Sequence, residues 1–195
     1  MQNKFNVIQI WIEDPDSPSA EMLGWMETII NNIPEGSTYT LVSTGNYFPG
    51  NPLVTWIDVN SKITEMQTNI PIIKDILSII SSKQKVELLS IYLGGVMNNI
   101  VYFDCDISLT GWPEEFMLEG KPLMYKENST SIYNRVFIVN DNKIKFIQVA
   151  AEIAQYMKSI YNKIKRIPYG ASFKVINAKM NNVNKINSNL ITHHR

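Results

Sequence analysis

The sequence predicts an α/β fold in which a mainly parallel sheet carries helices on both faces. Short apolar runs rich in β-branched residues alternate with longer segments whose apolar residues recur at helical spacing. The short runs show little polar alternation, which is typical of strands buried on both faces. The strands expected from these runs cover residues 7–12, 38–43, 53–59 and 100–103. Alternating strands and helices favour a parallel sheet with crossover helices.

Helices are expected between these strands and after them. The first follows Ser17 and Ser19, both candidate cap residues, and ends at Pro34-Glu35-Gly36. Further helices are expected at 71–81, at 85–93 with a stop at Gly94-Gly95, and at 145–163. Three more segments, 123–126, 135–139 and 173–176, are strand candidates.

Composition and charge narrow the class of protein. The chain has 195 residues, 45% of them hydrophobic and 18% charged, which is typical of a globular protein. Eighteen basic residues balance eighteen acidic ones, so net charge gives no sign of a nucleic-acid partner. Cys105 is the only cysteine, which excludes an internal disulfide. No apolar run reaches the ~20 residues of a membrane-spanning helix, and no signal-peptide layout is present, so a cytoplasmic location is expected.

Two carboxylates follow the strand expected at residues 100–103. Asp104 and Asp106 are two positions apart, so both would point to the same face if the strand continued. Ligands of open α/β sheets bind beyond the carboxyl ends of the strands, which is where this pair falls. A divalent cation relieves the repulsion between converging carboxylates and accepts phosphate oxygens as well. The pair is therefore a candidate catalytic and metal-binding site; a structural role as turn caps is the alternative.

The haloacid-dehalogenase-like phosphatases share this local pattern, since their strand leads into Asp-x-Asp and then a hydroxyl residue. Asp104-Cys105-Asp106-Ile107-Ser108 fits in outline, with Asp104 as the nucleophile. Those enzymes resemble one another in a further Asp pair near the C-terminus. After Glu127 this chain has only Asp141 and Glu152 as carboxylates, so the phosphatase hypothesis takes second place.

A longer stretch resembles a different class of enzyme. Residues 85–95 read Lys-Val-Glu-Leu-Leu-Ser-Ile-Tyr-Leu-Gly-Gly, and the Asp-x-Asp triplet follows. This is similar to the sugar-binding region of DXD-containing glycosyltransferases, which includes capsule-type, mannosyl and clostridial glucosylating-toxin enzymes. The resemblance implies a GT-A fold, a nucleotide-sugar donor with a UDP-sugar expected, and Mn²⁺ or Mg²⁺. It also implies donor contacts from Glu87, Gly94 and Gly95.

Two shorter matches extend this resemblance. The segment Ile8-Gln9-Ile10-Trp11-Ile12 is similar to the first strand of that group, in which a Trp stacks on the donor's base. Ile10 and Trp11 are then donor-binding candidates, whereas plain core packing is the alternative for a strand Trp. Near the C-terminus, Ile191-Thr192-His193-His194 resembles the group's late His, which makes His193 a third candidate metal ligand.

The sequence departs from the pattern of that group in two places. Ser90 stands where the group has an Arg that helps hold the donor, and Glu87 stands where it has an Asp. Eight residues, 96–103, separate Gly-Gly from Asp104, where the group has about three. The Gly-Gly pair is therefore expected in a loop before the strand. A non-catalytic member that kept the fold for binding is the third hypothesis.

The resemblance sets expectations for the whole chain. Residues 1–195 are expected to form a single glycosyltransferase-like domain, with the donor part at about 5–110 and the acceptor part at about 111–195. The acceptor would be a glycan or a protein, in surface polysaccharide synthesis or in the work of a protein-modifying effector. Cytoplasmic placement is expected first, and a membrane-peripheral protein or secreted effector is the alternative.

Overall fold

The computed structural model of the chain describes residues 4–12, 17–117, 123–125, 136–139, 143–180, 184–186 and 189–194. Its strands are β1 (Asn6–Trp11), β2 (Thr38–Ser43), β3 (Val54–Asp58), β4 (Ile100–Phe103), β5 (Ile107–Leu109), β6 (Leu123–Tyr125), β7 (Val136–Val139), β8 (Asn184–Ile186) and β9 (Ile191–His193). Its helices are α1 (Ala20–Asn32), α2 (Val59–Asn69), α3 (Ser82–Val96), α4 (Lys143–Ile164) and α5 (Ala171–Lys179), with 3-10 turns η1 (Pro71–Asp75) and η2 (Glu114–Met117). None of these described helices is long and apolar enough to cross a bilayer.

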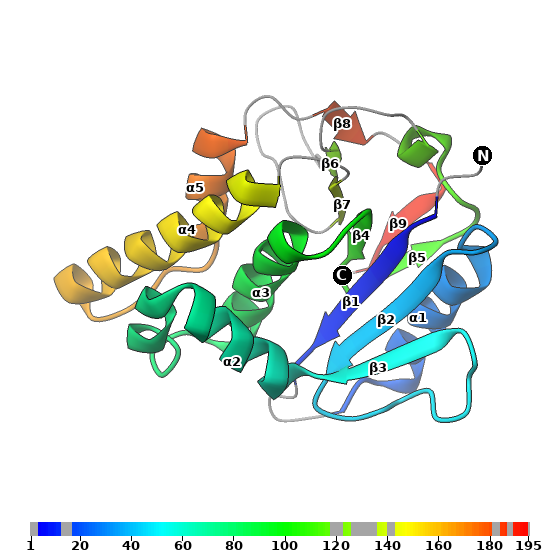
Figure 1. Cartoon of the computed structure of the whole chain (residues 1–195), viewed down its shortest axis with the longest axis horizontal. Helices are drawn as coiled ribbons and strands as arrows, with labels where there is room; N and C mark the ends of the chain where they lie inside the picture. Colours follow the sequence, from blue (N-terminus) through cyan, green and yellow to red (C-terminus); the bar gives the residue numbers. More distant parts are fainter. Residues whose placement is uncertain are drawn as a thin grey trace.

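Seven of the described strands form the main sheet, in the order β3-β2-β1-β4-β7-β6-β8. The four strands from β3 to β4 run parallel, β7 is antiparallel to both of its neighbours, and β8 runs parallel to β6. The chain leaves β1 through α1 on one face, and it reaches β4 through α2 and α3 on the other (Figure 1). The strand order therefore reverses between β1 and β4, which opens a crevice beyond their carboxyl ends.

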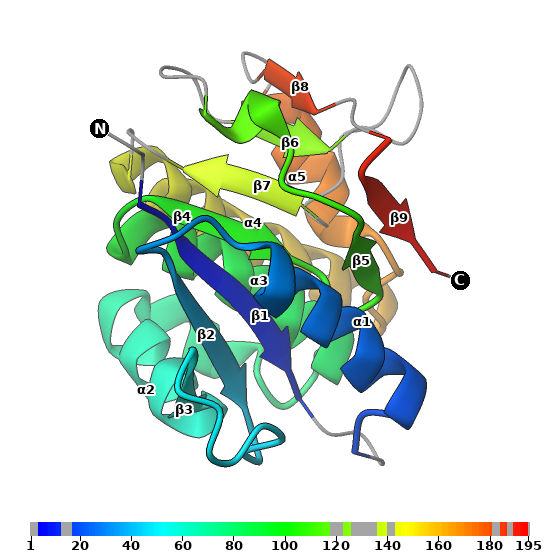
Figure 2. The ribbon, with the colours of Figure 1, turned by 90° about the vertical axis from the view of Figure 1, so that its right-hand side faces the viewer.

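Alternate residues of the central strands enter two separate cores. Val7 of β1 and Val101 of β4 pack with α1 on one face, whereas Ile8 and Ile100 pack with α2, α3, α4 and α5 on the other. Figure 2 shows α1 in front of the sheet and α3 and α4 behind it. Because both faces are covered, the central strands read as near-continuous apolar runs. The α/β class with helices on both faces is the one predicted from the sequence.

Helix α3 corrects the expected position of the Gly-Gly pair. Ser81 caps the start of the helix, where its side chain and that of Gln84 form a capping box, and the helix continues through Gly94 and Gly95 to Val96. The prediction of a loop at these glycines is wrong. A Cβ on Gly94 would lie 2.8 Å from Phe146 Cδ1 of α4, so the glycine allows the two helices to approach closely. Gly94 is therefore explained by close packing between α3 and α4, and it does not mark the end of the helix.

Three other local predictions also differ from the structure. The apolar pattern does not indicate helix α2, because only Val59 and Met66 of its eleven residues are buried. The helix expected at 71–81 is only the short 3-10 turn η1 followed by turns. The strand expected at 173–176 lies inside α5, which buries Val175 and Ile176. Lys126 and Arg135, at the ends of two other predicted strands, lie outside the described residues.

Candidate functional site

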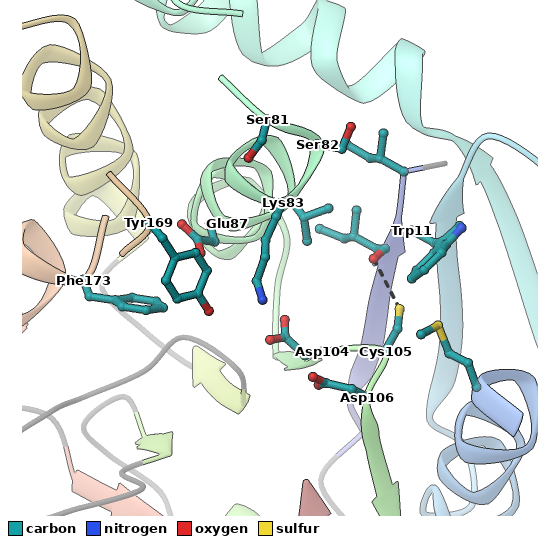
Figure 3. A pocket seen from close by; sticks show the side chains of 14 residues that line it. Trp11, Ser81, Ser82, Lys83, Glu87, Asp104, Cys105, Asp106, Tyr169 and Phe173 are labelled. Carbon is teal, nitrogen blue, oxygen red and sulfur yellow. Dashed lines mark hydrogen bonds between the residues drawn. The ribbon is translucent and has the colours of Figure 1, made fainter. Parts of the chain in front are cut away.

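A cavity of about 360 Å³ lies beyond the carboxyl ends of β1 and β4. Its walls come from the end of β1, from the first turns of α3, from the acidic triplet after β4, and from the segment around the start of α5 (Figure 3). This volume is in the range of small-molecule sites in proteins. The described residues that line it are Ile10, Trp11, Ile12, Met22, Ser81, Ser82, Lys83, Val86, Glu87, Asp104, Cys105, Asp106, Tyr169 and Phe173.

The acidic triplet forms a tight turn at the end of β4 instead of continuing the strand. The turn closes with a hydrogen bond of 3.2 Å from the Ile107 amide to the Asp104 carbonyl. Strand β1 fastens it from the side: Gln9 Nε2 donates to the same carbonyl at 3.0 Å, and the Cys105 thiol donates to the Ile10 carbonyl at 3.3 Å. Asp104 and Asp106 are both half-buried and line the cavity.

Two buried tyrosines stabilise this turn. The Tyr102 hydroxyl donates to Asp104 Oδ1 at 2.6 Å, and the Tyr39 hydroxyl donates to Gln9 Oε1 at 2.6 Å. Burial raises the pKa of both phenols well above the usual 10.0, and the neighbouring Asp104 charge raises that of Tyr102 further. Both phenols therefore remain neutral hydrogen-bond donors at physiological pH. They hold the turn in one arrangement.

Strand β9 brings His193 to the acidic triplet from the C-terminal end of the described chain. It pairs antiparallel with β5, with His193 opposite Ile107. His193 Nε2 lies 3.0 Å from Asp106 Oδ2, and the His194 amide donates to the Asp106 carbonyl at 2.9 Å. The predicted acidic pair and the predicted late His therefore lie at one place.

His194 anchors the same strand to α1. Its ring stacks on Trp25 at a centroid distance of 4.1 Å and an interplanar angle of 7°, and its Nε2 lies 2.8 Å from Ser108 Oγ. Neither Trp25 nor Ser108 carries a sequence signal for this contact, because both partners lie far from His194 along the chain. The contact fixes β9 beside β5, and so keeps His193 at Asp106.

The predicted donor-binding residues divide into two groups. Ile10, Trp11 and Glu87 line the cavity, whereas Gly94 and Gly95 are buried in α3 and are not among its lining residues. Trp11 is half-exposed, and its indole Nε1 has no hydrogen-bond acceptor among the described residues. A donor contact from Trp11 stays a prediction.

Glu87 is a carboxylate held inside the protein. It is 6% exposed, and the Ser172 hydroxyl of α5 donates to its Oε2 at 2.5 Å. Ser90, one turn further along α3, is 1% exposed, and its hydroxyl donates to the Glu87 main-chain carbonyl at 2.9 Å. Ser90 does not line the cavity.

Lys83, Tyr169 and Phe173 line the cavity but are not among the site residues predicted from the sequence. Lys83 lies one helical turn before Glu87 on α3, a spacing that could have identified it. Tyr169 and Phe173 come from the start of α5 and contact each other edge to face at 6.1 Å. Only the packing of α5 against α4 and α3 brings these two rings to the cavity.

The acidic pair and His193 have the side-chain chemistry of ligands to a hard divalent cation, although the part of the chain that the structure describes holds no ready-made metal cluster. Among the described residues, no group of three or more His, Cys, Asp and Glu is arranged to hold an ion. Asp104 and Asp106 nevertheless line the cavity, and His193 contacts one of them. Carboxylate oxygens with one imidazole nitrogen fit Mn²⁺ or Mg²⁺.

The fold of the whole chain was compared with those of known proteins. No protein-family model and no curated protein matches the sequence. Among solved structures, a transferase mutant is 14% identical, with a TM-score of 0.57, over 97% of this chain and 94% of that one. The galactosyltransferase LgtC, in complex with donor and acceptor sugar analogues, is 12% identical, with a TM-score of 0.56, over 94% of this chain and 74% of its own.

A third similar structure is the apo form of mouse xyloside xylosyltransferase 1. It is 10% identical, with a TM-score of 0.55, over 90% of this chain and 82% of its own. The fold is that of the GT-A glycosyltransferases. This confirms the fold that the sequence resemblance implied. The GT-A fold leaves the donor open, because one of these proteins is a galactosyltransferase and another a xylosyltransferase.

Proposed function

We propose that this chain is a metal-dependent glycosyltransferase that binds a nucleotide-sugar, with a UDP-sugar as the expected donor, in the cavity beyond β1 and β4. Asp104 and Asp106 line that cavity, and His193 contacts Asp106 at 3.0 Å; this arrangement carries the proposal. It lies at the point where the strand order reverses, which is the usual ligand site of such sheets. The likeness to GT-A glycosyltransferases supports the same reaction class.

In this proposal, Asp104, Asp106 and His193 hold Mn²⁺ or Mg²⁺. The ion, when bound, supplies positive charge to the diphosphate as the bond between sugar and phosphate breaks. Tyr102 and Gln9 keep Asp104 in position, so the carboxylates need not rearrange when the donor binds. The ring of Trp11 supplies an apolar surface for the base, and the buried Glu87 supplies acceptors for hydroxyl groups.

The acceptor is proposed to be a glycan or a protein bound by the later part of the chain, residues 111–195. Surface polysaccharide synthesis is the proposed setting, and modification of a protein by an effector is the alternative. The first test is calorimetry with UDP-glucose, UDP-galactose and GDP-mannose, each with and without Mn²⁺. Metal-dependent binding of one of them is expected, and no binding of any would contradict the proposal.

The role of the acidic pair has its own test. Asp106→Asn should weaken metal-dependent donor binding by at least about tenfold, because the substitution removes a charge from the metal site. Asp75→Asn is the matched control, since Asp75 is an exposed carboxylate paired with Lys158 at 2.7 Å. If both variants bind the donor like the unmodified protein, the metal assignment is wrong.

The phosphatase hypothesis requires a different use of Asp104. A phosphatase of the haloacid-dehalogenase kind would form a phosphoaspartate there, and a fluoride mimic of phosphate would bind to Asp104. Fluorine NMR with beryllium fluoride detects such an adduct. An adduct that Asp104→Asn abolishes would favour the phosphatase over the transferase. A protein that binds donor but releases no nucleoside diphosphate with any acceptor would instead be the non-catalytic member.

A further inference from the structure

Lys83 is the single cationic residue among the described residues that line the cavity. It is the second residue of α3, and its side chain is exposed. Figure 3 shows the side chain extending from α3 toward the part of the cavity that Asp104 and Asp106 line. A lysine in this position adds the positive charge that an anionic ligand requires.

An aromatic ring, rather than a carboxylate, holds this ammonium group. Lys83 Nζ lies 4.8 Å from the centroid of the Tyr169 ring, within the range of a cation–π contact. Among the described residues, no ion pair involves Lys83. A ring face positions a cation without neutralising its charge, so the ammonium retains its capacity to bind an anion. Tyr169 is in turn supported edge to face by Phe173.

Two other residues of α3, Glu87 and Ser90, show why Lys83 supplies the positive charge of the cavity. Lys83 and Glu87 are four residues apart on the helix and both line the cavity. Ser90 stands where the resembled pattern has an Arg, and its hydroxyl is buried and bonded to the Glu87 carbonyl. Ser90 therefore offers the cavity no cation, and the charge enters the cavity from a position closer to the start of the helix.

We propose that Lys83 binds the diphosphate of the nucleotide-sugar donor and that Tyr169 positions its ammonium group for this contact; the inference rests on the proposed function. Among the described residues, the carboxylates of Asp104, Asp106 and Glu87 line the cavity, and they would repel a diphosphate. An ammonium group donates charge-assisted hydrogen bonds to phosphate oxygens, which offsets this repulsion. Lys83 is thus a residue of the leaving-group site.

The test compares ligands that differ only in phosphate. Binding of UDP, UMP and uridine in the presence of Mn²⁺ is measured by calorimetry for the unmodified protein and for Lys83→Gln. We expect Lys83→Gln to weaken UDP binding by about tenfold to a hundredfold and to leave uridine binding unchanged, because charged hydrogen bonds have about that effect. The UDP effect should diminish as salt rises, since screening weakens an exposed charge.

Three further variants separate charge from shape. Lys83→Arg keeps the charge and should retain most of the UDP affinity. Tyr169→Phe keeps the ring face and should bind UDP normally, whereas Tyr169→Leu should bind it several-fold more weakly. Lys85→Gln is the matched control, because Lys85 lies two residues away on α3 and does not line the cavity. Thermal denaturation of each variant checks that the fold is retained.

The outcomes distinguish this inference from the proposed function. If the unmodified protein binds UDP with Mn²⁺ and Lys83→Gln binds it equally well, the inference is wrong and the proposed function stands. An equal loss for UDP and uridine would show that Lys83 shapes the cavity and would also overturn the inference. If the unmodified protein binds neither UDP nor GDP, ADP or CDP, the proposed function itself fails, and the role of Lys83 fails with it.

Discussion

His193 Nε2 lies 3.0 Å from Asp106 Oδ2, although the two residues are 87 positions apart in the sequence. The contact is possible because β9 pairs with β5 directly after the acidic triplet. His194 reinforces the pairing through its stack on Trp25. A histidine from the end of the described chain is thereby joined to a carboxylate from its middle.

From this contact we predict that His193→Ala lowers the affinity for Mn²⁺ by about tenfold or more, because loss of a metal ligand or of its hydrogen-bonded partner has effects of this size. Electron paramagnetic resonance of free Mn²⁺ during a titration measures the affinity without any turnover. Thr192→Ala, an exposed residue of the same strand, is the control. If His193→Ala and Thr192→Ala bind Mn²⁺ with equal affinity, His193 is not a metal ligand.

Gly94→Ala is predicted to destabilise the protein and to leave donor binding intact. The added Cβ would meet Phe146 at 2.8 Å, and overpacking of this kind costs about 1–3 kcal/mol. The melting temperature should fall by about 2–4 °C per kcal/mol in a chain of this size. Gly24→Ala is the control: outside its own helix backbone, no atom of the described residues lies within 4 Å of an added Cβ, so alanine should raise stability by about 0.5–1 kcal/mol. Loss of UDP affinity without loss of stability would instead support a donor contact at Gly94.

Tyr39→Phe is predicted to lower the free energy of unfolding by about 1–3 kcal/mol at neutral pH, because Gln9 Oε1 loses a buried donor. Urea denaturation measures the change. Tyr161→Phe, a half-exposed tyrosine of α4, is the control and should unfold like the unmodified protein. Identical unfolding of all three proteins would show that the bond between Tyr39 and Gln9 adds no stability.

Tyr39→Phe also tests how the stability of the protein depends on alkaline pH. Burial raises the pKa of Tyr39 above its usual 10.0, so the folded protein keeps a proton that the unfolded chain releases above about pH 10. The stabilisation from this phenol is fully present below that pH and is lost as pH rises further. The difference in unfolding free energy between the unmodified protein and Tyr39→Phe should therefore narrow above about pH 10. A difference that stays constant would contradict the assigned direction of the pKa shift.

The Cys105 thiol is predicted to react slowly in the folded protein. It is 7% exposed, and burial together with the charges of Asp104 and Asp106 raises the pKa of the thiol well above its usual 9.0. Because the thiolate is the reactive form, modification by Ellman's reagent should be at least about tenfold slower than in concentrated guanidinium chloride. The chain has one cysteine, so the absorbance reports on this thiol alone. Equal rates in both conditions would show that the acidic turn is open.

Much of the central sheet follows from local sequence pattern. β2 and β4 have the bounds that their apolar runs predict, and the acidic pair follows β4 as expected. Strands buried on both faces need continuous apolar side chains. Such runs can be recognised in the sequence without knowing which strands pair with them. The GT-A fold could likewise be predicted from the sequence, because the motif around Asp104 resembles that class of enzyme. The similarity to solved structures confirms this prediction.

Local pattern did not reveal the shorter elements. β5 and β9 have three residues each and are stabilised by pairing with each other rather than by their own propensity. The segment that became α5 has the β-branched residues Val175 and Ile176, and packing against α4 overrides that preference. Elements whose stability comes from tertiary contacts leave a weak local signal.

The sequence by itself determined the class of fold, the central strands and the carboxylates Asp104 and Asp106 at the end of β4. The resemblance also indicated His193, and the pairing of β9 with β5 brings that residue to Asp106, whereas only the tertiary structure decided that Lys83 and Tyr169 line the same cavity, through the packing of α3 against α5. The reason is physical. Periodicity reports which side of an element is buried, whereas a site is made by contacts between elements, which depend on how the whole chain packs.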